Sequence, residues 1–460
     1  MHQDKIKSWA FPSLRSGRDT PSPTIALHKL GCSKNQIDGE RMFGMLVKAG
    51  FSAAADLSRA DIIIVNTCAF ILEAQQEAID AILESAQFKK SGRCSLLVVA
   101  GCFSQRFRNE ARTRLPEVDL WLGVHDWQKL LQTALHLPKA SAGSRVLFPP
   151  IATQYLKIAE GCSRRCSFCA IPFIRGPLKS RPGPEIIKEA QWLYSRGVRE
   201  CILVSQDTSS YGKDIGGSLT RLLEQFLAKT KFPWIRLMYL HPQCVDDEFL
   251  RLVAQEKRLL PYFDIPLQHI SDEILISMKR RPLSKGIFRL LDRIRAMVPD
   301  AAIRTTLIAG YPGETKRHFE ELLAFVEKAR FEHLGVFPFS PEKGTAAYYL
   351  AKRPANSTAG KRCEMIMSLA RDISGRVCAS RIGKTIDVII DGPAREHGVA
   401  IGTRAQRTKA PHALDGRSVW DAPDVDGTVI IPGGVSVGAI VPVTVVSAGD
   451  YELFGVPAAR

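Results

Sequence analysis

The chain has 460 residues, of which 45% are hydrophobic and 24% are charged, and its formal net charge is +16. This composition is typical of a globular protein of about three domains. It excludes a membrane-spanning protein, because no apolar run is long enough to cross a bilayer. The positive charge fits a partner such as RNA or the ribosome, and equally a solvated basic surface.

Residues 1–22 mix lysine, arginine, serine and proline without an apolar segment. Such a stretch is typical of a disordered tail and differs from a secretory signal. The chain nevertheless contains eleven cysteines. Without a secretory signal, these favour metal or cluster binding in a reducing cytoplasm over disulfide formation.

From residue 23 to 144, β-branched runs alternate with helical patterns. Strands are predicted at 25–29, 61–66, 95–100 and 119–123. The helices between and after them are predicted at 36–49, 71–87, 105–115 and 127–135. This alternation predicts an N-terminal open parallel-sheet α/β domain.

Cys32, Cys68 and Cys102 directly follow three of these predicted strands. Because ligand sites in open α/β sheets lie beyond the carboxyl ends of the strands, we expect the three thiols at one edge. Three thiolates in one place are typical ligands of an iron–sulfur cluster, and they leave one iron open. The alternative is that they are buried structural cysteines.

A second group of cysteines lies in one short loop, where Cys162, Cys166 and Cys169 have the spacing C-x₃-C-x₂-C. A bacterial ferredoxin would supply four cysteines with a shorter first gap, and a structural zinc site would have four ligands. Three thiolates predict instead a cluster with one iron open to another ligand, and free cysteines are the alternative. Five basic residues crowd this loop, either as solvated charges or as partners of an anionic ligand: Arg164, Arg165, Arg175, Lys179 and Arg181.

The strand–helix alternation starts again between residues 151 and 381. Six strands are predicted at 155–159, 201–204, 235–239, 262–265, 303–308 and 334–337. Amphipathic helices intervene, for example at 184–195 and 318–329. Six repeats are too few to close an eight-stranded barrel, so we predict a partial (βα)6 barrel with its site at the carboxyl ends of the strands.

Polar residues and turn glycines follow these strands and are predicted to bind a cofactor at the barrel mouth. They are Ser205, Gln206 and Asp207 after the second strand, Gln268 and His269 after the fourth, and Gly310, Pro312, Gly313 and Glu314 after the fifth. Taken singly, each also has a structural explanation as a turn, a helix cap or a hydrogen-bonded histidine. Their shared position at the strand ends favours a binding role.

From residue 383 to 457 the pattern changes to β-runs separated by glycine, proline and aspartate. Strands at 385–390, 399–403, 427–431 and 440–446 indicate a small antiparallel β-barrel. Residues 385–460 contain six basic and nine acidic side chains, a net charge of −3. An acidic module suits a basic protein partner better than RNA phosphates, and a neutral packing domain is the alternative.

The C-x₃-C-x₂-C loop after a first barrel strand resembles the loop of radical S-adenosylmethionine (radical SAM) enzymes. Over residues 25–454 the chain is similar to the methylthiotransferases of that superfamily. The matching segments are 30–35 (LGCSKN), 66–70 (NTCAF), 101–102 (GC), the central cysteines and 310–315 (GYPGET). Ser33 and Gly39 depart from the proline and serine usual in the family, and neither is a proposed ligand.

Finer motifs resemble the methylthiotransferases that modify a ribosomal protein. They are 115–119 (LPEVD), 204–208 (VSQDT), 264–269 (DIPLQH) and 421–427 (DAPDVDG). The resemblance implies that residues 383–457 are a TRAM domain. It also implies an electron donor, such as flavodoxin, and a sulfur donor as partners.

The resemblance implies that Cys162, Cys166 and Cys169 hold a catalytic 4Fe–4S cluster, which binds S-adenosylmethionine through its open iron. One-electron cleavage would give a 5′-deoxyadenosyl radical that removes a hydrogen atom from an unactivated carbon. A second 4Fe–4S cluster on the cysteines at positions 32, 68 and 102 would supply sulfur, and a second S-adenosylmethionine the methyl group. The implied acceptor is the β-carbon of an aspartate in small-subunit ribosomal protein twelve.

Two other functions are alternatives. One is a tRNA methylthiotransferase that modifies an adenosine, and the other is a non-enzymatic iron–sulfur protein. The acidic C-terminal segment and the motifs around Asp207 and Asp264 speak against the first. The open irons and the ring of strand-end residues speak against the second.

Overall fold

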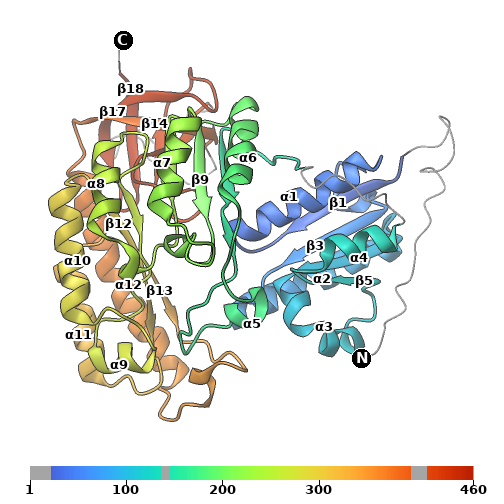
Figure 1. The fold of residues 1–460 in the computed structure, drawn as a ribbon, viewed down its shortest axis with the longest axis horizontal. Helices are drawn as coiled ribbons and strands as arrows, with labels where there is room; N and C mark the ends of the chain where they lie inside the picture. Colours follow the sequence, from blue (N-terminus) through green and yellow to red (C-terminus); the bar gives the residue numbers. More distant parts are fainter. Residues whose placement is uncertain (1–21, 136–144, 395–411, 459–460) are drawn as a thin grey trace, which may run out of the picture. The chain divides into compact units, whose positions relative to one another are not determined.

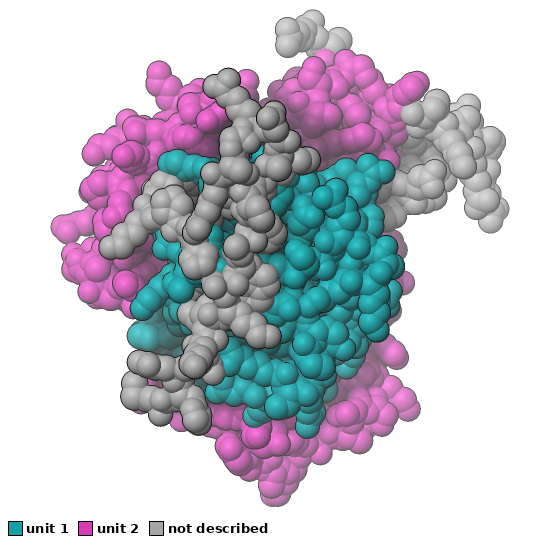
Figure 2. Space-filling view, turned by 90° about the vertical axis from the view of Figure 1, so that its right-hand side faces the viewer, with its two compact units in different colours: residues 1–148, 161–163, 169–177 teal, residues 149–160, 164–168, 178–460 magenta. Residues whose placement is uncertain are grey.

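A computed structural model of the chain describes residues 22–135, 145–394 and 412–458 (Figure 1). The predicted tail, except for residue 22, and the predicted strand at 399–403 lie outside these ranges. The internal contacts divide the chain into two compact units, which Figure 2 distinguishes by colour. Unit 1 comprises the described residues up to Phe148 together with Gly161–Ser163 and Cys169–Pro177, and unit 2 comprises the described remainder.

Unit 1 is built on a five-stranded parallel sheet with the strand order β2-β1-β3-β4-β5. The strands are β1 (Thr24–Lys29), β2 (Ser52–Ala53), β3 (Ile62–Thr67), β4 (Leu96–Gly101) and β5 (Leu120–Leu122). The helices are α1 (Ser33–Lys48), α2 (Leu72–Ser91), α3 (Cys102–Arg114), α4 (Trp127–Ala134) and α5 (Ile171–Arg175), with a 3-10 turn η2 (Leu57–Arg59). The parallel-sheet prediction is confirmed.

Strands β3 and β4 are buried along their whole length. Successive side chains of a strand point to opposite faces. Accordingly, Ile63 and Val65 belong to one apolar core, and Ile62 and Ile64 belong to another. Burial on both faces explains why these strands appear in the sequence as continuous apolar runs.

Unit 2 contains six barrel strands in two parallel three-stranded sheets, ordered β6-β9-β10 and β11-β12-β13. They are β6 (Thr153–Lys157), β9 (Glu200–Val204), β10 (Trp234–Leu237), β11 (Tyr262–Asp264), β12 (Ala302–Ala309) and β13 (His333–Pro338). Just beyond β10, the Leu240 nitrogen donates to the Asp264 carbonyl oxygen at the end of β11, at 2.8 Å. The six strands therefore follow one another in chain order, as the partial-barrel prediction requires.

Helices of unit 2 follow these strands, and α8, α10 and α11 line one side of the unit (Figure 1). The helices are α6 (Gly183–Ser195), α7 (Leu219–Lys229), α8 (Asp247–Gln255), α9 (Asp272–Ser277), α10 (Ser284–Met297), α11 (Lys316–Ala329) and α12 (Asn356–Ala379). Strands β7 (Ala159–Glu160) and β8 (Lys179–Ser180) pair as a two-stranded sheet, and the cysteine loop lies between them in the sequence. Of the described helices, none combines the length and the apolar character needed to cross a membrane.

The C-terminal part of unit 2 is a closed five-stranded barrel with the order β14-β15-β16-β18-β17. Its strands are β14 (Thr385–Pro393), β15 (Leu414–Ser418), β16 (Thr428–Ile431), β17 (Ile440–Ala448) and β18 (Glu452–Pro457). All pairs are antiparallel except β16 with β18, which are parallel. The small barrel was predicted, whereas this parallel pair was not.

Buried ion pairs join this barrel to strands β9 and β10. Arg417 of β15 donates to Glu200 of β9 at 2.7 Å, and Arg236 of β10 donates to the same carboxylate at 2.7 Å. Arg236 also donates to the carbonyl oxygens of Ser418 and Val419. Polar contacts therefore hold the barrel against these two strands, and Cys378 of α12 packs into the apolar core of the barrel.

Candidate functional site

The N-terminal cysteine group (Cys32, Cys68 and Cys102) lies at the carboxyl edge of the sheet of unit 1. Cys32 directly precedes α1, Cys68 follows β3, and Cys102 is the first residue of α3. The Cys68 thiol interacts electrostatically with the other two, so the three side chains form one neighbourhood. They do not surround one point as single-ion ligands would: in the described residues no three His, Cys, Asp or Glu side chains do. Ligands of a multi-iron cluster need not surround one point, because they bind different iron atoms.

Two glycines allow the strand ends to approach each other at this edge. Gly31 has a φ of +81°, and a Cβ atom there would lie 2.8 Å from the Cβ atom of Cys68. Gly101 has a φ of +95°, and a Cβ atom there would lie 2.5 Å from the carbonyl oxygen of Thr67. Both positions need glycine, for its left-handed backbone and for the space.

Burial and charge give the three thiols different pKa values. Burial, followed by the charges of Cys32 and Cys102, raises the pKa of Cys68 to about 12. Burial also raises the pKa of Cys102, although Arg175 opposes it. For Cys32, burial is outweighed by Lys34, Arg175 and two backbone N–H groups, so its pKa is lowered. The surroundings of Cys32 therefore favour its thiolate form, which is the form of cysteine that binds metals.

The central cysteine group (Cys162, Cys166 and Cys169) occupies the loop after β7. Cys162 and Cys169 belong to unit 1, where the Cys162 nitrogen donates to the Gly176 carbonyl oxygen at 3.0 Å. Cys166 belongs to unit 2, where Arg280 Nη1 donates to its Sγ at 3.7 Å. Arg280 is itself buried and donates to the main chain that follows β11.

Ser167 anchors the same loop to the end of helix α9 and to the turn after β12 in unit 2. Its nitrogen donates to the Met278 carbonyl oxygen at 3.0 Å, and its hydroxyl donates to the Ser277 carbonyl oxygen at 2.9 Å. The Ser167 hydroxyl also lies 2.8 Å from the Tyr311 hydroxyl. Tyr311 belongs to the predicted glycine turn after the fifth barrel strand, so the loop and this turn meet.

Arg164, between the first two central cysteines, binds the ends of β9 and β10. Its Nε donates to Asp207 Oδ2 at 2.6 Å, and its Nη1 donates to Gln243 Oε1 at 3.0 Å. Its Nη2 donates to Ser210 Oγ at 3.3 Å and to Cys244 Sγ at 3.0 Å. Asp207 is buried, so this ion pair forms largely out of water. Arg164 therefore has specific partners and is not a solvated charge.

His241, four residues beyond β10, lies in the same polar group. Its nitrogen donates to Ser209 Oγ at 2.8 Å. Burial lowers the pKa of its side chain far below the ordinary value, and the nearby cations Arg280, Arg164 and Lys213 lower it further. His241 is therefore neutral at physiological pH and can accept a hydrogen bond.

The predicted residue Glu314 holds the glycine turn together. Its Oε2 accepts from the Gly310 nitrogen at 2.8 Å, and its Oε1 accepts from Arg362 Nη1 at 2.6 Å. Next to it, the side chain of His269 is fully buried, and its Nε2 lies 3.6 Å from Glu314 Oε2. At that distance no hydrogen bond forms. The structure thus brings these two predicted residues together.

Ser205 and Gln206 follow β9 directly. The Ser205 hydroxyl accepts from the Asp207 nitrogen at 3.2 Å, and the Ser205 nitrogen donates to Thr208 Oγ1 at 3.0 Å. Gln206 Nε2 donates to Glu160 Oε1 at 2.6 Å, just before the central loop. Gln206 Oε1 and the Nε2 of His269 are buried atoms without a hydrogen-bond partner within the described residues.

The remaining predicted residues shape the backbone. Gln268 has a φ of +75°, and its nitrogen donates to the Thr306 carbonyl oxygen at 2.8 Å. Pro312 is buried, and the Gly313 nitrogen donates to the Lys352 carbonyl oxygen at 3.0 Å. Neither Gly313 nor Gln268 is therefore available through its backbone nitrogen for a ligand.

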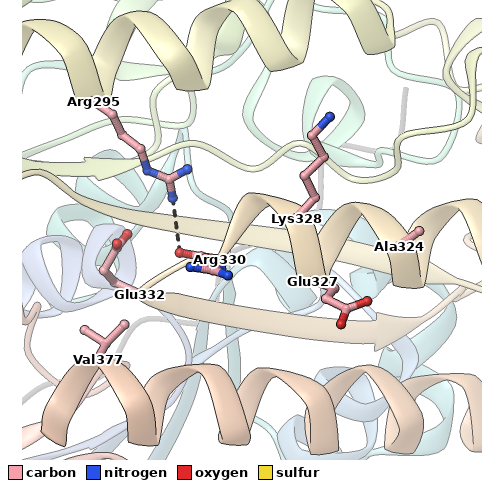
Figure 3. Close-up of a pocket in the computed structure, with 7 residues that line it drawn as sticks. All are labelled: Arg295, Ala324, Glu327, Lys328, Arg330, Glu332 and Val377. Atoms are coloured by element: carbon pink, nitrogen blue, oxygen red, sulfur yellow. Dashed lines mark hydrogen bonds between the residues drawn. The ribbon is translucent and has the colours of Figure 1, made fainter. Parts of the chain in front are cut away.

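A surface hollow of about 720 Å³ lies elsewhere in unit 2, where β13 begins (Figure 3). It is lined by Arg295, Ala324, Glu327, Lys328, Arg330, Glu332 and Val377. Arg295 donates to the Arg330 carbonyl oxygen at 3.1 Å, and Glu332 accepts from the Ile303 nitrogen at 2.7 Å. These side chains thus stabilise the start of the strand, at the end opposite to the predicted site.

Sequence reasoning missed two polar residues at the cysteines, Arg280 and Asn35. Arg280 lies 114 residues beyond Cys166, and nothing in the local pattern marks it. Asn35 stands in the LGCSKN segment, so its proximity to Cys32 was a usable signal. Its amide donates to the Thr67 carbonyl oxygen at 2.8 Å and is fully buried.

Three family models match successive parts of the chain. The uncharacterized protein family UPF0004 matches residues 24–123, the radical SAM superfamily matches residues 156–326, and the TRAM domain matches residues 382–457. These segments correspond to the three domains predicted from the sequence, whose boundaries remain predictions.

Curated relatives match nearly the whole chain. The ribosomal protein uS12 methylthiotransferase RimO of Syntrophus aciditrophicus is 41% identical over 454 residues, covering 94% of this chain and 97% of the relative. The RimO of Sorangium cellulosum is 40% identical, and the match covers 93% of this chain and 89% of the relative. The RimO of Synechocystis sp. is 38% identical, and the match covers 95% of this chain and 98% of the relative. The chain belongs to the RimO family. As a member of the RimO family with a radical SAM domain, it is a group-transferring enzyme.

Among solved structures, the RimO-family chain is similar to a radical S-adenosylmethionine methyltransferase, TsrM from Kitasatospora setae with cobalamin and a 4Fe–4S cluster bound. The TM-score is 0.51 at 14% sequence identity, and the match covers 71% of this chain and 77% of TsrM. At this identity the likeness shows the fold alone.

Proposed function

We propose that this chain adds a methylthio group to the β-carbon of an aspartate in ribosomal protein uS12. The observation that supports this most is the end-to-end similarity to curated RimO proteins in a chain with two groups of three cysteines. Methylthio transfer to an unactivated carbon needs a source of radicals and a source of sulfur. The two cysteine groups provide a place for each.

The residues present fit the implied cofactors. Thiolates are the usual ligands of iron–sulfur clusters, and both cysteine groups consist of three. The central group would hold a 4Fe–4S cluster that binds S-adenosylmethionine, and the N-terminal group would hold a second 4Fe–4S cluster. When bound, the first supplies the radical that removes a hydrogen atom, and the second supplies sulfur.

The side chains of the chain hold and orient these groups. Arg280 donates to Cys166, and Ser167 fixes the loop through Tyr311. Among the predicted cofactor residues, Gln206 and His269 have buried polar atoms without a hydrogen-bond partner in the described residues, which fits a polar ligand at the strand ends. The nine predicted contacts remain Ser205, Gln206, Asp207, Gln268, His269, Gly310, Pro312, Gly313 and Glu314.

The C-terminal barrel is proposed to dock the substrate protein. The net charge of −3 over residues 385–460 favours a basic protein partner and disfavours RNA phosphates. This charge also argues against the alternative, modification of a tRNA adenosine. An electron donor such as flavodoxin and a sulfur donor complete the proposed system, which we place in the cytoplasm.

The test is deletion of the gene followed by mass spectrometry of the small-subunit ribosomal proteins and of the tRNA nucleosides. We expect uS12 to lose the mass of one methylthio group while the tRNA nucleosides stay unchanged. The wild-type gene should restore the modification, and the Cys166→Ala gene should not. Loss of the group from tRNA with unchanged uS12 would establish the alternative instead.

A further inference from the structure

Arg175 places a buried positive charge against a cysteine of the N-terminal group. It is the last residue of α5, six residues beyond Cys169 in the sequence, and it is 2% exposed. Its Nε lies 3.4 Å and its Nη2 lies 3.3 Å from Cys102 Sγ, and both donate to it. Its Nη1 donates to Asp38 Oδ2 at 2.8 Å. Two of its N–H groups therefore point at one sulfur atom.

Asn35 fixes the direction of this guanidinium. The Oδ1 atom of Asn35 accepts from Arg175 Nη2, while its Nδ2 donates to the Thr67 carbonyl oxygen at 2.8 Å. The Asn35 main chain is held in turn, because its carbonyl oxygen accepts from Asn66 Nδ2 at 2.6 Å. The side-chain amide therefore cannot turn without losing two buried hydrogen bonds, and Arg175 stays aimed at Cys102.

The segment that carries Arg175 is packed into unit 1. Ala170 and Ile174 belong to the same apolar core as Val99 and Cys102. The Gly176 carbonyl oxygen accepts from the Cys162 nitrogen at 3.0 Å. The chain that leaves the third central cysteine is thus tied to the sheet whose edge bears the N-terminal group.

A buried guanidinium needs anionic partners, because removing the charge from water costs several kcal/mol. Asp38 supplies one negative charge. A Cys102 thiolate bound to a cluster supplies a second negative charge. N–H···S hydrogen bonds to such a thiolate help to set the reduction potential of the cluster.

We propose that Arg175 is a positioning residue that holds Cys102 as a cluster ligand and raises the reduction potential of the N-terminal cluster. The added electron makes the reduced cluster more negative, and the positive charge with two N–H···S hydrogen bonds stabilises that state. This inference rests on the proposed function, since it requires a cluster on the N-terminal group. It means that the segment following the central cysteine group also sets the reduction potential of the cluster on the N-terminal cysteine group.

The test uses the full chain with Cys162, Cys166 and Cys169 changed to alanine, reconstituted with iron and sulfide, so that only the N-terminal cluster forms. Its midpoint potential is measured by a redox titration followed by electron paramagnetic resonance. In this parent, Arg175→Met should shift the midpoint to more negative values. Arg175→Lys keeps the charge but loses the paired N–H groups, so it should shift the midpoint in the same direction by less.

Arg145→Met is the matched control. Arg145 is also a buried arginine of unit 1, and its Nε donates to Glu40 Oε2 at 2.6 Å. Removing it also takes the arginine from a carboxylate, but neither Arg145 nor Glu40 is among the charges that shift the pKa values of the three thiols. It should leave the midpoint at the parent value, which separates the effect of Arg175 from a general loosening of unit 1.

The outcomes are distinguishable. A parent that binds no cluster would overturn the two-cluster function itself. A cluster that assembles in Arg175→Met with the parent midpoint would overturn only the inference about Arg175. If Arg175→Met binds no cluster while Arg145→Met does, the holding role is supported, and the Arg175→Lys midpoint decides the redox role. An unshifted midpoint there would overturn that role.

Discussion

Glu200 is the residue whose replacement tests how unit 2 holds its C-terminal barrel. Its carboxylate is fully buried and accepts from Arg236 Nε and Arg417 Nη2, each at 2.7 Å, and from Thr153 Oγ1 at 3.1 Å. The Glu200→Gln variant keeps the shape of the side chain but removes the negative charge. Two buried guanidinium groups then lose the carboxylate that they share.

Two arguments give the size of the effect. Removing one partner of a buried ion pair costs about 3–5 kcal/mol of unfolding free energy. Independently, burial would raise the pKa of Glu200, but Arg417 and Arg236 outweigh it and lower the pKa from 4.5 to about 2. A shift of that size corresponds to roughly 3 kcal/mol of stability near neutral pH.

The assay is urea unfolding followed by tryptophan fluorescence, with Asp247→Asn as the control. The Asp247 pair with Arg293 is solvent-exposed, its side chains being 58% and 43% exposed, so its loss should cost about 1 kcal/mol or less. Because the folded pKa of Glu200 is depressed, its contribution is complete above pH 4.5 and is lost as the pH falls towards 2. The gap between wild type and Glu200→Gln should close over that window. An equal cost for both variants, or a gap that does not change with pH, would refute the reasoning.

Three further predictions concern the cysteine groups and the C-terminal barrel. Cys166→Ala should abolish cleavage of S-adenosylmethionine, measured as 5′-deoxyadenosine by chromatography. Cys68→Ala should keep this cleavage but lose methylthio transfer. Cleavage that survives in Cys166→Ala would contradict the assignment of the central cysteines. Gly101→Ala, whose Cβ atom would lie 2.5 Å from a carbonyl oxygen, should reduce bound iron from about eight to about four atoms per chain; full iron content would show that the edge tolerates a side chain. Changing the exposed residues Asp387 and Asp424 to asparagine should weaken uS12 binding about threefold at low salt and reduce the salt dependence of binding. Binding is measured by isothermal titration calorimetry. An unchanged affinity would exclude the barrel as the docking surface.

The sequence predicted the fold best where buried strands appear as continuous apolar runs. Strand β4 is apolar throughout, β3 is apolar as far as Val65, and both predicted ranges lie within one residue of the observed ones. Strand β15 was missed because it reads LDGRS, with no apolar alternation. Its Arg417 and Ser418 are buried against polar partners in distant segments, which no local pattern reveals. Strand β2 has only two residues and shows no period at all.

The site divides in the same way. The cysteines could be located from their spacing and from the strands that precede them. Arg175 was noticed among the basic residues of the loop, but its partner Cys102 lies 73 residues earlier. Glu314 was predicted at the mouth, yet its carboxylate is engaged by Gly310 and Arg362. Such roles follow from contacts between segments far apart in the chain, so they become visible only in the folded structure.

The placement of residues 169–177 in unit 1 has a consequence for engineering this enzyme. A fragment cut after Phe148 would keep the whole N-terminal sheet but lose Ile174 from its apolar core and Arg175 from its cysteines. The N-terminal part is therefore not a self-contained module. A chimera between two family members should exchange residues 169–177 together with the N-terminal segment, so that each N-terminal cysteine group keeps the arginine that donates to it.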